Sequence, residues 1–172
     1  MELTEARLIY VLSWIAVRAG AAAVASALGV QSPNACPIRD GLARTAADAS
    51  LLFVSPPIDG FVLAVGRGLA RDEMLVASLS TTFGEAQAFH CDGKRDSYGW
   101  GRSVAGKIVR AVGWNQGEIA TDGEPTAGEP TDLTDVAEMD VAKVAGNWSV
   151  RPGALLALLD ERTGIIGGRR GC

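Results

Sequence analysis

Residues 85–114 read EAQAFHCDGKRDSYGWGRSVAGKIVRAVGW, and the pattern of these residues indicates the type of sheet. It contains three runs with the alternation and the aromatic and β-branched residues that are typical of strands. The runs are Glu85–His90, Tyr98–Val104 and Lys107–Trp114. Ala105-Gly106 stands where the last two runs would need a tight hairpin turn. The stretch therefore predicts consecutive antiparallel strands.

The flanking segments predict further strands, helices and loops. Strands are expected over Arg7–Val17 (with a helix as the alternative), Ser50–Val54 and Phe61–Val65, the last two forming a hairpin-like pair around Pro56–Gly60. Helices are expected over Ala19–Leu28, Ile38–Ala47, Asp72–Phe83, Asp135–Ala145 and Gly153–Leu159. Loops are expected over Gln31–Pro37, which has two prolines, and over the polar Gly117–Pro130.

Two of the expected helices have assignable ends and faces. Asp72 is a suitable N-cap, Gly84 a suitable stop, and Met74, Leu75 and Leu79 an apolar face. In the later helix the apolar positions are Val136, Met139, Val141 and Val144, and Gly146 is the expected end.

The chain length and the order of elements indicate the fold class. A chain of 172 residues fits one globular domain, residues 1–172, with a core that needs no disulfide or metal. Strands joined by short loops, with helices between them, predict an α+β fold. The expected architecture is a mostly antiparallel or mixed β-sheet with helices packed on one face.

Charge and cysteine usage exclude several classes of protein. A net charge of −4 argues against nucleic acid as the partner, since phosphate binding needs a basic surface. Three widely spaced cysteines without a CxxC pair indicate free thiols in a reducing compartment, so a cytoplasmic location is expected. Arg18 interrupts the N-terminal apolar run, so no membrane span is expected.

Three short motifs resemble ligand sites but fit turns better. Gly101–Lys107 matches the start of a phosphate-binding P-loop, yet Ile108 replaces the required hydroxyl and the flanks alternate like strands. Gly66-Arg67-Gly68 lacks the third glycine of a dinucleotide site. His90-Cys91-Asp92 is read as a strand end, although Cys36 could meet His90 in space. No cofactor, no metal site and no catalytic residue is predicted.

The segment from Gly117 to Asp140 is the strongest charge anomaly, with acidic residues and neither lysine nor arginine. One interpretation is a solvated loop followed by a helix whose first turn is acidic. The other is an acidic surface that attracts a basic partner, with a tryptophan as an anchor. The candidate partner-binding residues are Glu118, Asp122, Glu124, Glu129, Asp132 and Trp114.

Three segments resemble a group of bacterial proteins of uncharacterised function, found in actinobacteria and myxobacteria. They are residues 53–66 (FVSPPIDGFVLAVG), 83–89 (FGEAQAF) and 145–152 (AGNWSVRP), which match the pattern PPxxGWxLxVG, FGEvQ and WSvdP. Phe61 stands where the group has Trp, and Arg151 where it has Asp. The resemblance covers roughly residues 19–168. Small bacterial proteins of this kind are often immunity partners of secreted toxins, which is an association and not a mechanism.

Three hypotheses of function follow from the sequence. The first is a non-enzymatic protein-binding module, such as an immunity or inhibitor protein, whose acidic C-terminal surface binds a protein partner, for example a basic toxin. The second is a small enzyme or ligand-binding domain with a site where Pro56–Gly60 and His90–Arg95 meet. The third is a structural subunit of a larger assembly.

Overall fold

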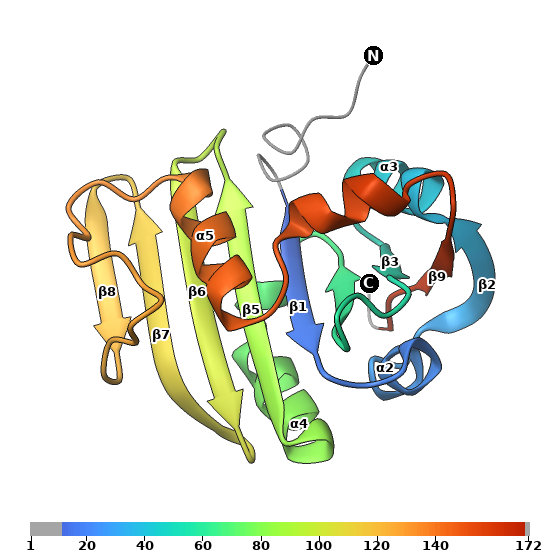
Figure 1. Ribbon diagram of the computed structural model, residues 1–172, viewed down its shortest axis with the longest axis horizontal. Coiled ribbons are helices and arrows are strands. Elements are labelled where there is room, and N and C mark those ends of the chain that lie inside the picture. Colours follow the sequence, from blue (N-terminus) through green and yellow to red (C-terminus); the bar gives the residue numbers. More distant parts are fainter. Residues whose placement is uncertain (1–11, 171–172) are drawn as a thin grey trace.

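One nine-stranded antiparallel sheet organises the computed structural model, which describes residues 12–170 (Figure 1). The strand order is β2-β9-β3-β4-β1-β5-β6-β7-β8. The strands are β1 (Ser13–Val17), β2 (Gln31–Pro37), β3 (Leu51–Val54), β4 (Val62–Val65), β5 (Glu85–Asp92), β6 (Ser97–Val104), β7 (Lys107–Asn115), β8 (Glu118–Asp122) and β9 (Thr163–Gly168). The helices are α2 (Ala21–Ala27), α3 (Ile38–Ala47), α4 (Glu73–Phe83) and α5 (Glu138–Trp148), with 3₁₀ helices η1 (Leu69–Arg71) and η2 (Pro152–Leu158).

The expected α+β class and the antiparallel sheet are confirmed. β5, β6 and β7 form a meander, and Ala105 and Gly106 turn the β6–β7 hairpin with φ of 48° and 83°. β3 and β4 pair around the Pro56–Gly60 turn. The predicted strand over Arg7–Val17 is present as β1, and its first five residues lie outside the described part of the chain.

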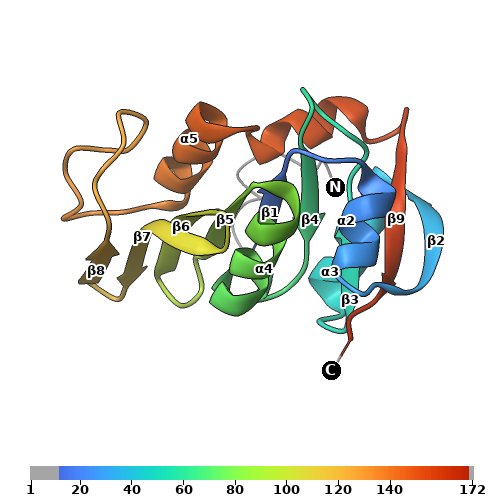
Figure 2. The same ribbon diagram turned by 90° about the horizontal axis from the view of Figure 1, so that it is seen from below.

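Helices cover both faces of the sheet, whereas one face was expected (Figure 2). On one face, α3, α5 and η2 pack on Trp14, Phe53 and Phe89. On the other, α2, η1 and α4 pack on residues such as Ile15 and Leu52. β3 and β4 are apolar at every position, because their side chains point alternately to two buried faces. A strand that is buried at every position, such as β1, indicates that helices cover both faces of the sheet.

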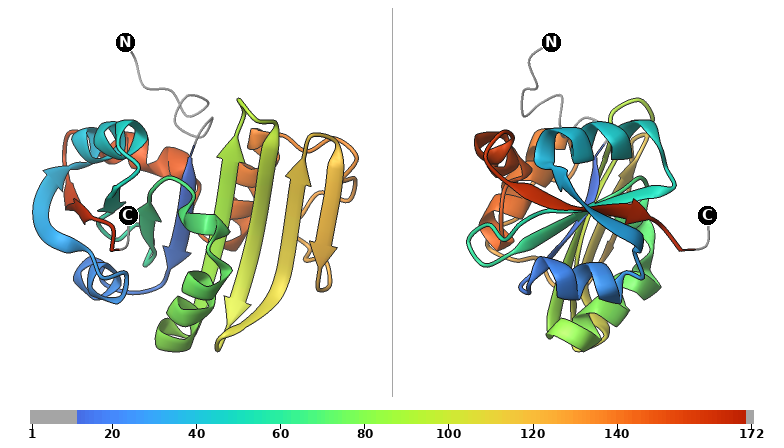
Figure 3. Two further views of the ribbon diagram at one scale, coloured as in Figure 1. Left: turned by 180° about the vertical axis from the view of Figure 1, so that it is seen from behind. Right: turned by 90° about the vertical axis from the view of Figure 1, so that its right-hand side faces the viewer.

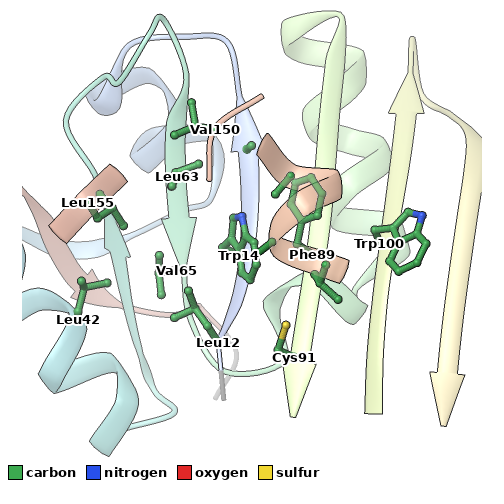
Figure 4. Packing of buried hydrophobic residues seen from close by; sticks show 14 of the residues in the cluster. Leu12, Trp14, Leu42, Leu63, Val65, Phe89, Cys91, Trp100, Val150 and Leu155 are labelled. Atoms are coloured by element: carbon green, nitrogen blue, oxygen red, sulfur yellow. The ribbon is translucent and has the colours of Figure 1, made fainter. Parts of the chain in front are cut away.

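The larger core lies beneath α5 and η2 (Figure 4). Trp14 and Phe89, on neighbouring strands, stack with ring centroids 5.2 Å apart, and Trp148 of α5 packs on Phe89 at 6.0 Å. Aromatic pairs of this geometry add about 0.5–1.5 kcal/mol to the free energy of burial. Trp14, Phe89 and Trp148 therefore anchor α5 to the middle of the sheet.

Both edges of the sheet were expected to be loops, and both predictions were wrong. β2 is an edge strand in spite of Pro33 and Pro37, because a proline is tolerated where its missing N–H would face solvent. β8 occupies the first 5 residues after Gly117 in the polar segment, and all of them are exposed. An exposed edge strand needs no apolar alternation, so its sequence resembles that of a loop.

Other boundaries differ in detail. Asp72 caps α4 by accepting a hydrogen bond from the Leu75 amide, and Gly84 follows the helix as expected. α5 runs past Gly146 to Trp148, and Met74 and Met139, expected in the core, are 86% and 47% exposed. No strand was expected near residues 163–168. There β9 is rich in glycine because a Cβ on Gly164 would lie 2.3 Å from the Val54 carbonyl oxygen.

Candidate functional site

Within residues 12–170, one region of the sheet is covered by helices mainly on one side. Seen from behind, α4 crosses β5 and contacts β6 and β7 at their hairpin, and no other described helix lies over the back of β6, β7 and β8 (Figure 3, left). A groove with a volume of about 610 Å³ lies on this back surface, beside η1 and α4. It is the candidate functional site.

Strand register fixes the floor of this groove, because residues paired across strands share a face. Three rows cross β6, β7 and β8 in that order. The rows are Ser97–Asn115–Glu118, Gly99–Gly113–Ala120 and Gly101–Ala111–Asp122. Their neighbours along the strands, such as Trp100 and Trp114, point to the α5 face. The middle row has no side chain larger than a methyl group, so the floor is largely backbone.

The floor glycines differ in what their backbone requires. A Cβ on Gly99 would lie 2.7 Å from the Val112 carbonyl oxygen, so close approach of the strands demands glycine. A Cβ on Gly113 would have nothing within 4 Å, and neither residue has the positive φ that favours glycine. Gly113 is therefore required neither by packing nor by backbone conformation, and its absent side chain leaves the groove open.

The outer wall of the groove is acidic. Glu118 and Asp122 lie on β8, two positions on either side of Ala120, and their side chains point to the groove face. β8 itself is the last strand of the sheet. Because residues 111–142 include no lysine or arginine, the sequence around this wall supplies no cation of its own.

The inner wall carries a hydrogen-bonded polar cluster of Arg71, His90 and Ser97. The guanidinium of Arg71 donates to His90 Nε2 through Nε at 3.1 Å and through Nη2, and Nη2 also donates to Ser97 Oγ at 2.9 Å. No carboxylate among residues 12–170 pairs with Arg71. Since Nε2 accepts these bonds, the imidazole is neutral and its proton sits on Nδ1. Nδ1 is buried and has no partner within the described chain.

Burial and the neighbouring Arg71 charge lower the pKa of His90 to about 4. His90 is therefore neutral at physiological pH. Its one lone pair in the ring plane accepts from Arg71, so the ring is not free to act as a general base. The chemistry that this cluster offers is a positively charged guanidinium held in place at the groove wall.

Three of the six predicted partner-binding residues line this groove, namely Trp114, Glu118 and Asp122. Glu124 and Asp132 are exposed beyond it, and Asp132 accepts hydrogen bonds from the amide and hydroxyl of Thr134. Trp114 is 8% exposed and lies in the core under the α5 face, so it is not an exposed anchor.

Glu129 lies in the interior, not on the acidic surface. Its carboxylate and the Arg110 guanidinium form an ion pair at 2.7 Å with side-chain exposures of 1% and 3%. Burial raises the pKa of Glu129, but bonds from Arg110, Thr126 and Trp100 outweigh it, and the net pKa is below the usual value. Arg110 also donates to the Gly123 carbonyl at 2.7 Å. This pair fixes the segment that follows β8.

The other residues that were expected to meet in space lie far apart. Pro56–Gly60 lies beside the Val17 end of β1, whereas His90 pairs with Ser13 at the opposite end, about 14 Å away. Cys36 lies on β2, five strands from His90 in the sheet. Cys36 and Cys91 are buried free thiols, and burial raises the pKa of Cys91. Within residues 12–170, no group of three or more His, Cys, Asp or Glu residues is placed to hold a metal ion.

Sequence reasoning missed Arg71, Ser97 and the glycine floor. The signal was present as an alternation of large and small residues, because Tyr98 and Trp100 alternate with Gly99 and Gly101.

No helix within residues 12–170 is long and apolar enough to cross a membrane. Searches of models of known protein families, of the curated proteins and of the solved structures find no match to this chain, so the resemblance to the bacterial group stays a prediction.

Proposed function

We propose that this protein is a non-enzymatic protein-binding module that binds a basic segment of a partner through β8 and the adjacent groove. One observation carries the proposal. The free edge strand of the sheet presents two carboxylates, Glu118 and Asp122, to an open groove with a glycine and alanine floor. The proposal keeps the acidic surface expected from the sequence but reduces it to these two residues.

Electrostatics favour a cationic partner at this place. Glu118 and Asp122 are exposed and share one face of β8 with only Ala120 between them. Their fields add over that face, which raises the association rate of a cation and disfavours an acidic partner. A secreted toxin with a basic surface is one partner with this chemistry, as an immunity protein would require.

The floor favours long side chains from the partner. Lysine and arginine have aliphatic stems that lie well on apolar or backbone surfaces while the charged group stays near water. Gly113, where an added Cβ would have nothing within 4 Å, leaves room for such a stem. A partner side chain can therefore fill the groove while its charged end approaches Glu118 or Asp122.

Binding of a simple cationic peptide tests the proposal. The probe is a fluorescein-labelled peptide of alternating lysine and valine, followed by fluorescence anisotropy at low salt. We expect saturable binding that weakens at least tenfold in the double variant Glu118→Gln/Asp122→Asn. The matched control, Glu124→Gln/Asp132→Asn, changes net charge equally outside the groove and should weaken binding less than threefold.

Two results would contradict the proposal. Absence of binding by the wild-type protein at low salt would remove it outright. Equal weakening in both double variants would mean that the peptide responds to net charge and not to the groove.

A second candidate function is binding of a small anionic ligand at the inner wall. Arg71 favours it, because His90 and Ser97 hold its guanidinium without neutralising its charge. Titration with succinate would test it through the NMR signals of the single histidine of the chain. A saturable shift that Arg71→Gln abolishes would support this site, and unchanged His90 signals would dismiss it.

A further inference from the structure

The β7–β8 hairpin determines which backbone groups of β8 face outward. Gln116 and Gly117 form its two-residue turn, with φ of 51° and 89°. Such a turn closes with a hydrogen-bonded pair, here Asn115 and Glu118. Hydrogen-bonded and non-hydrogen-bonded pairs alternate along an antiparallel ladder. Ala120 and Asp122 therefore also bond to β7, and the N–H and C=O groups of Ile119 and Thr121 point away from the sheet.

This free edge has the geometry that accepts another strand. A strand added to β8 would form its hydrogen bonds with Ile119 and Thr121. Its side chains on the groove face would lie opposite Glu118, Ala120 and Asp122, in line with the floor rows. On the other face, Ile119 is 42% exposed and offers an apolar contact.

A second copy of the chain is a poor occupant of this edge. Antiparallel pairing of β8 with itself, with Ile119 opposite Thr121, would place Glu118 directly opposite Asp122 twice. Like charges directly opposite one another destabilise a strand pair. The strand that complements β8 has cations at the two outer positions, and β8 has no cation that could supply them.

The central position of the added strand, opposite Ala120, has a different requirement. A residue opposite Ala120 meets only a methyl group, and behind it lies Gly113 on the next strand, about 4.8 Å further into the sheet. A long side chain at this position can cross Ala120 and lie on the floor. The edge and the groove therefore act as one site, since the strand binds at the edge while its central side chain fills the groove.

We propose that the basic partner adds a tenth strand to the sheet at β8. Its backbone pairs with Ile119 and Thr121, two cations lie opposite Glu118 and Asp122, and a long side chain between them enters the groove over Ala120. This inference rests on the proposed function and adds the binding mode and the pattern of the partner sequence.

N-methylation of a probe peptide separates strand addition from charge attraction. The probe is an acetylated, amidated peptide with the core Lys-Val-Arg-Val-Lys, in which the cations face the groove and the valines face Ile119 and Thr121. One derivative carries N-methyl groups on both valines, whose N–H groups face β8. Its matched control carries two N-methyl groups on the first Lys and the Arg, whose N–H groups face away.

We expect the valine-methylated peptide to bind at least tenfold more weakly than the parent, and the control to bind within threefold of it. Equal affinity of both derivatives, with the dependence on Glu118 and Asp122 intact, would overturn strand addition and leave the proposed function standing. Absence of binding by the parent peptide would remove both.

Amide hydrogen exchange gives an independent measurement on the protein itself. Saturation with the parent peptide should slow exchange at Ile119 and Thr121 and leave Ala120, already bonded to β7, nearly unchanged. Slowing that is spread evenly over residues 118–122, or absent there, would contradict the added strand.

Discussion

The two edges of the sheet are protected in different ways. β2 contains Pro33 and Pro37, the register shifts between Gln31 and Asn34, and Ser32 has a φ of 48°. Prolines and irregularities of this kind prevent another strand from pairing. β8 has neither, and its ladder with β7 runs in continuous register. Within residues 12–170, β8 is protected by its acidic side chains, and under the proposed function these exclude most strands but admit a cationic one.

The faces next to these edges differ as well. α2 and α3 pack on opposite faces of the sheet near β3 and β9, beside β2. β7 and β8 have the segment up to α5 on one side (Figure 1) and the groove on the other. An edge combined with an open face of small residues is what the proposed binding function requires, whereas the edge at β2 lies beside two covered faces.

The ion pair that secures the segment after β8 should give the largest effect. Glu129→Gln leaves the buried charge of Arg110 without its partner, which should cost about 3–5 kcal/mol of unfolding free energy. Arg110 also donates to the carbonyls of Asp122 and Gly123. We therefore expect Glu129→Gln to accelerate amide exchange more in β8 than in β2. Urea denaturation and hydrogen exchange measure both effects.

The control is Glu124→Gln, an exposed residue whose change should stay within about 0.5 kcal/mol. Equal destabilisation by the two variants would show that the Arg110–Glu129 pair does not hold the segment.

The paired floor glycines should respond in opposite directions. Gly99→Ala forces a Cβ against the Val112 carbonyl oxygen and should cost about 1–3 kcal/mol. Gly113→Ala has free space and should stabilise the strand by about 0.5–1 kcal/mol. Thermal or urea unfolding of both variants measures the difference. A loss of stability in Gly113→Ala would mean that this glycine has a structural role. It would contradict the inference that Gly113 serves to keep the groove open.

Acidification should weaken the fold through His90. Its pKa is lowered to about 4 in the folded protein, so below the usual 6.5 the unfolded chain binds more protons. Stability should therefore fall as the pH drops from about 6.5 to 4, by roughly 1 kcal/mol after allowance for solvent near this partly exposed ring.

The single histidine makes this prediction direct to check. An NMR titration of its imidazole signals should give a midpoint near 4, and Arg71→Gln should raise it. A midpoint near the ordinary value of 6.5 in the native protein would contradict the Arg71–His90–Ser97 arrangement.

Removal of the β8 charges should have the smallest effect on stability. Glu118→Gln/Asp122→Asn should change the unfolding free energy by less than about 0.5 kcal/mol. It should, however, allow β8 to pair with β8 of a second copy, since the repulsion is gone. Light scattering over a range of concentrations should show a monomer in the wild type and self-association in the variant. Self-association of the wild type itself would favour a subunit of a larger assembly.

Several elements follow from the sequence because their signals are local. Asp72 and Gly84 bound α4, the Ala105-Gly106 turn closes its hairpin, and Ile38–Ala47 is a helix with the predicted limits. Each depends on residues within a few positions of one another. The acidic character of Glu118 and Asp122 was also evident from the sequence, because charge requires no fold to be recognised.

Tertiary structure decided which of these features belong together. Glu129 belongs to the same acidic run as Glu118, yet the fold buries it against Arg110 and leaves Glu118 at the rim of the groove. β2 and β8 are strands because neighbouring strands β9 and β7 offer them hydrogen bonds, which no local pattern encodes. Residue type sets charge, turn and helix end, whereas burial, pairing and the position of an edge depend on contacts between residues far apart in the chain.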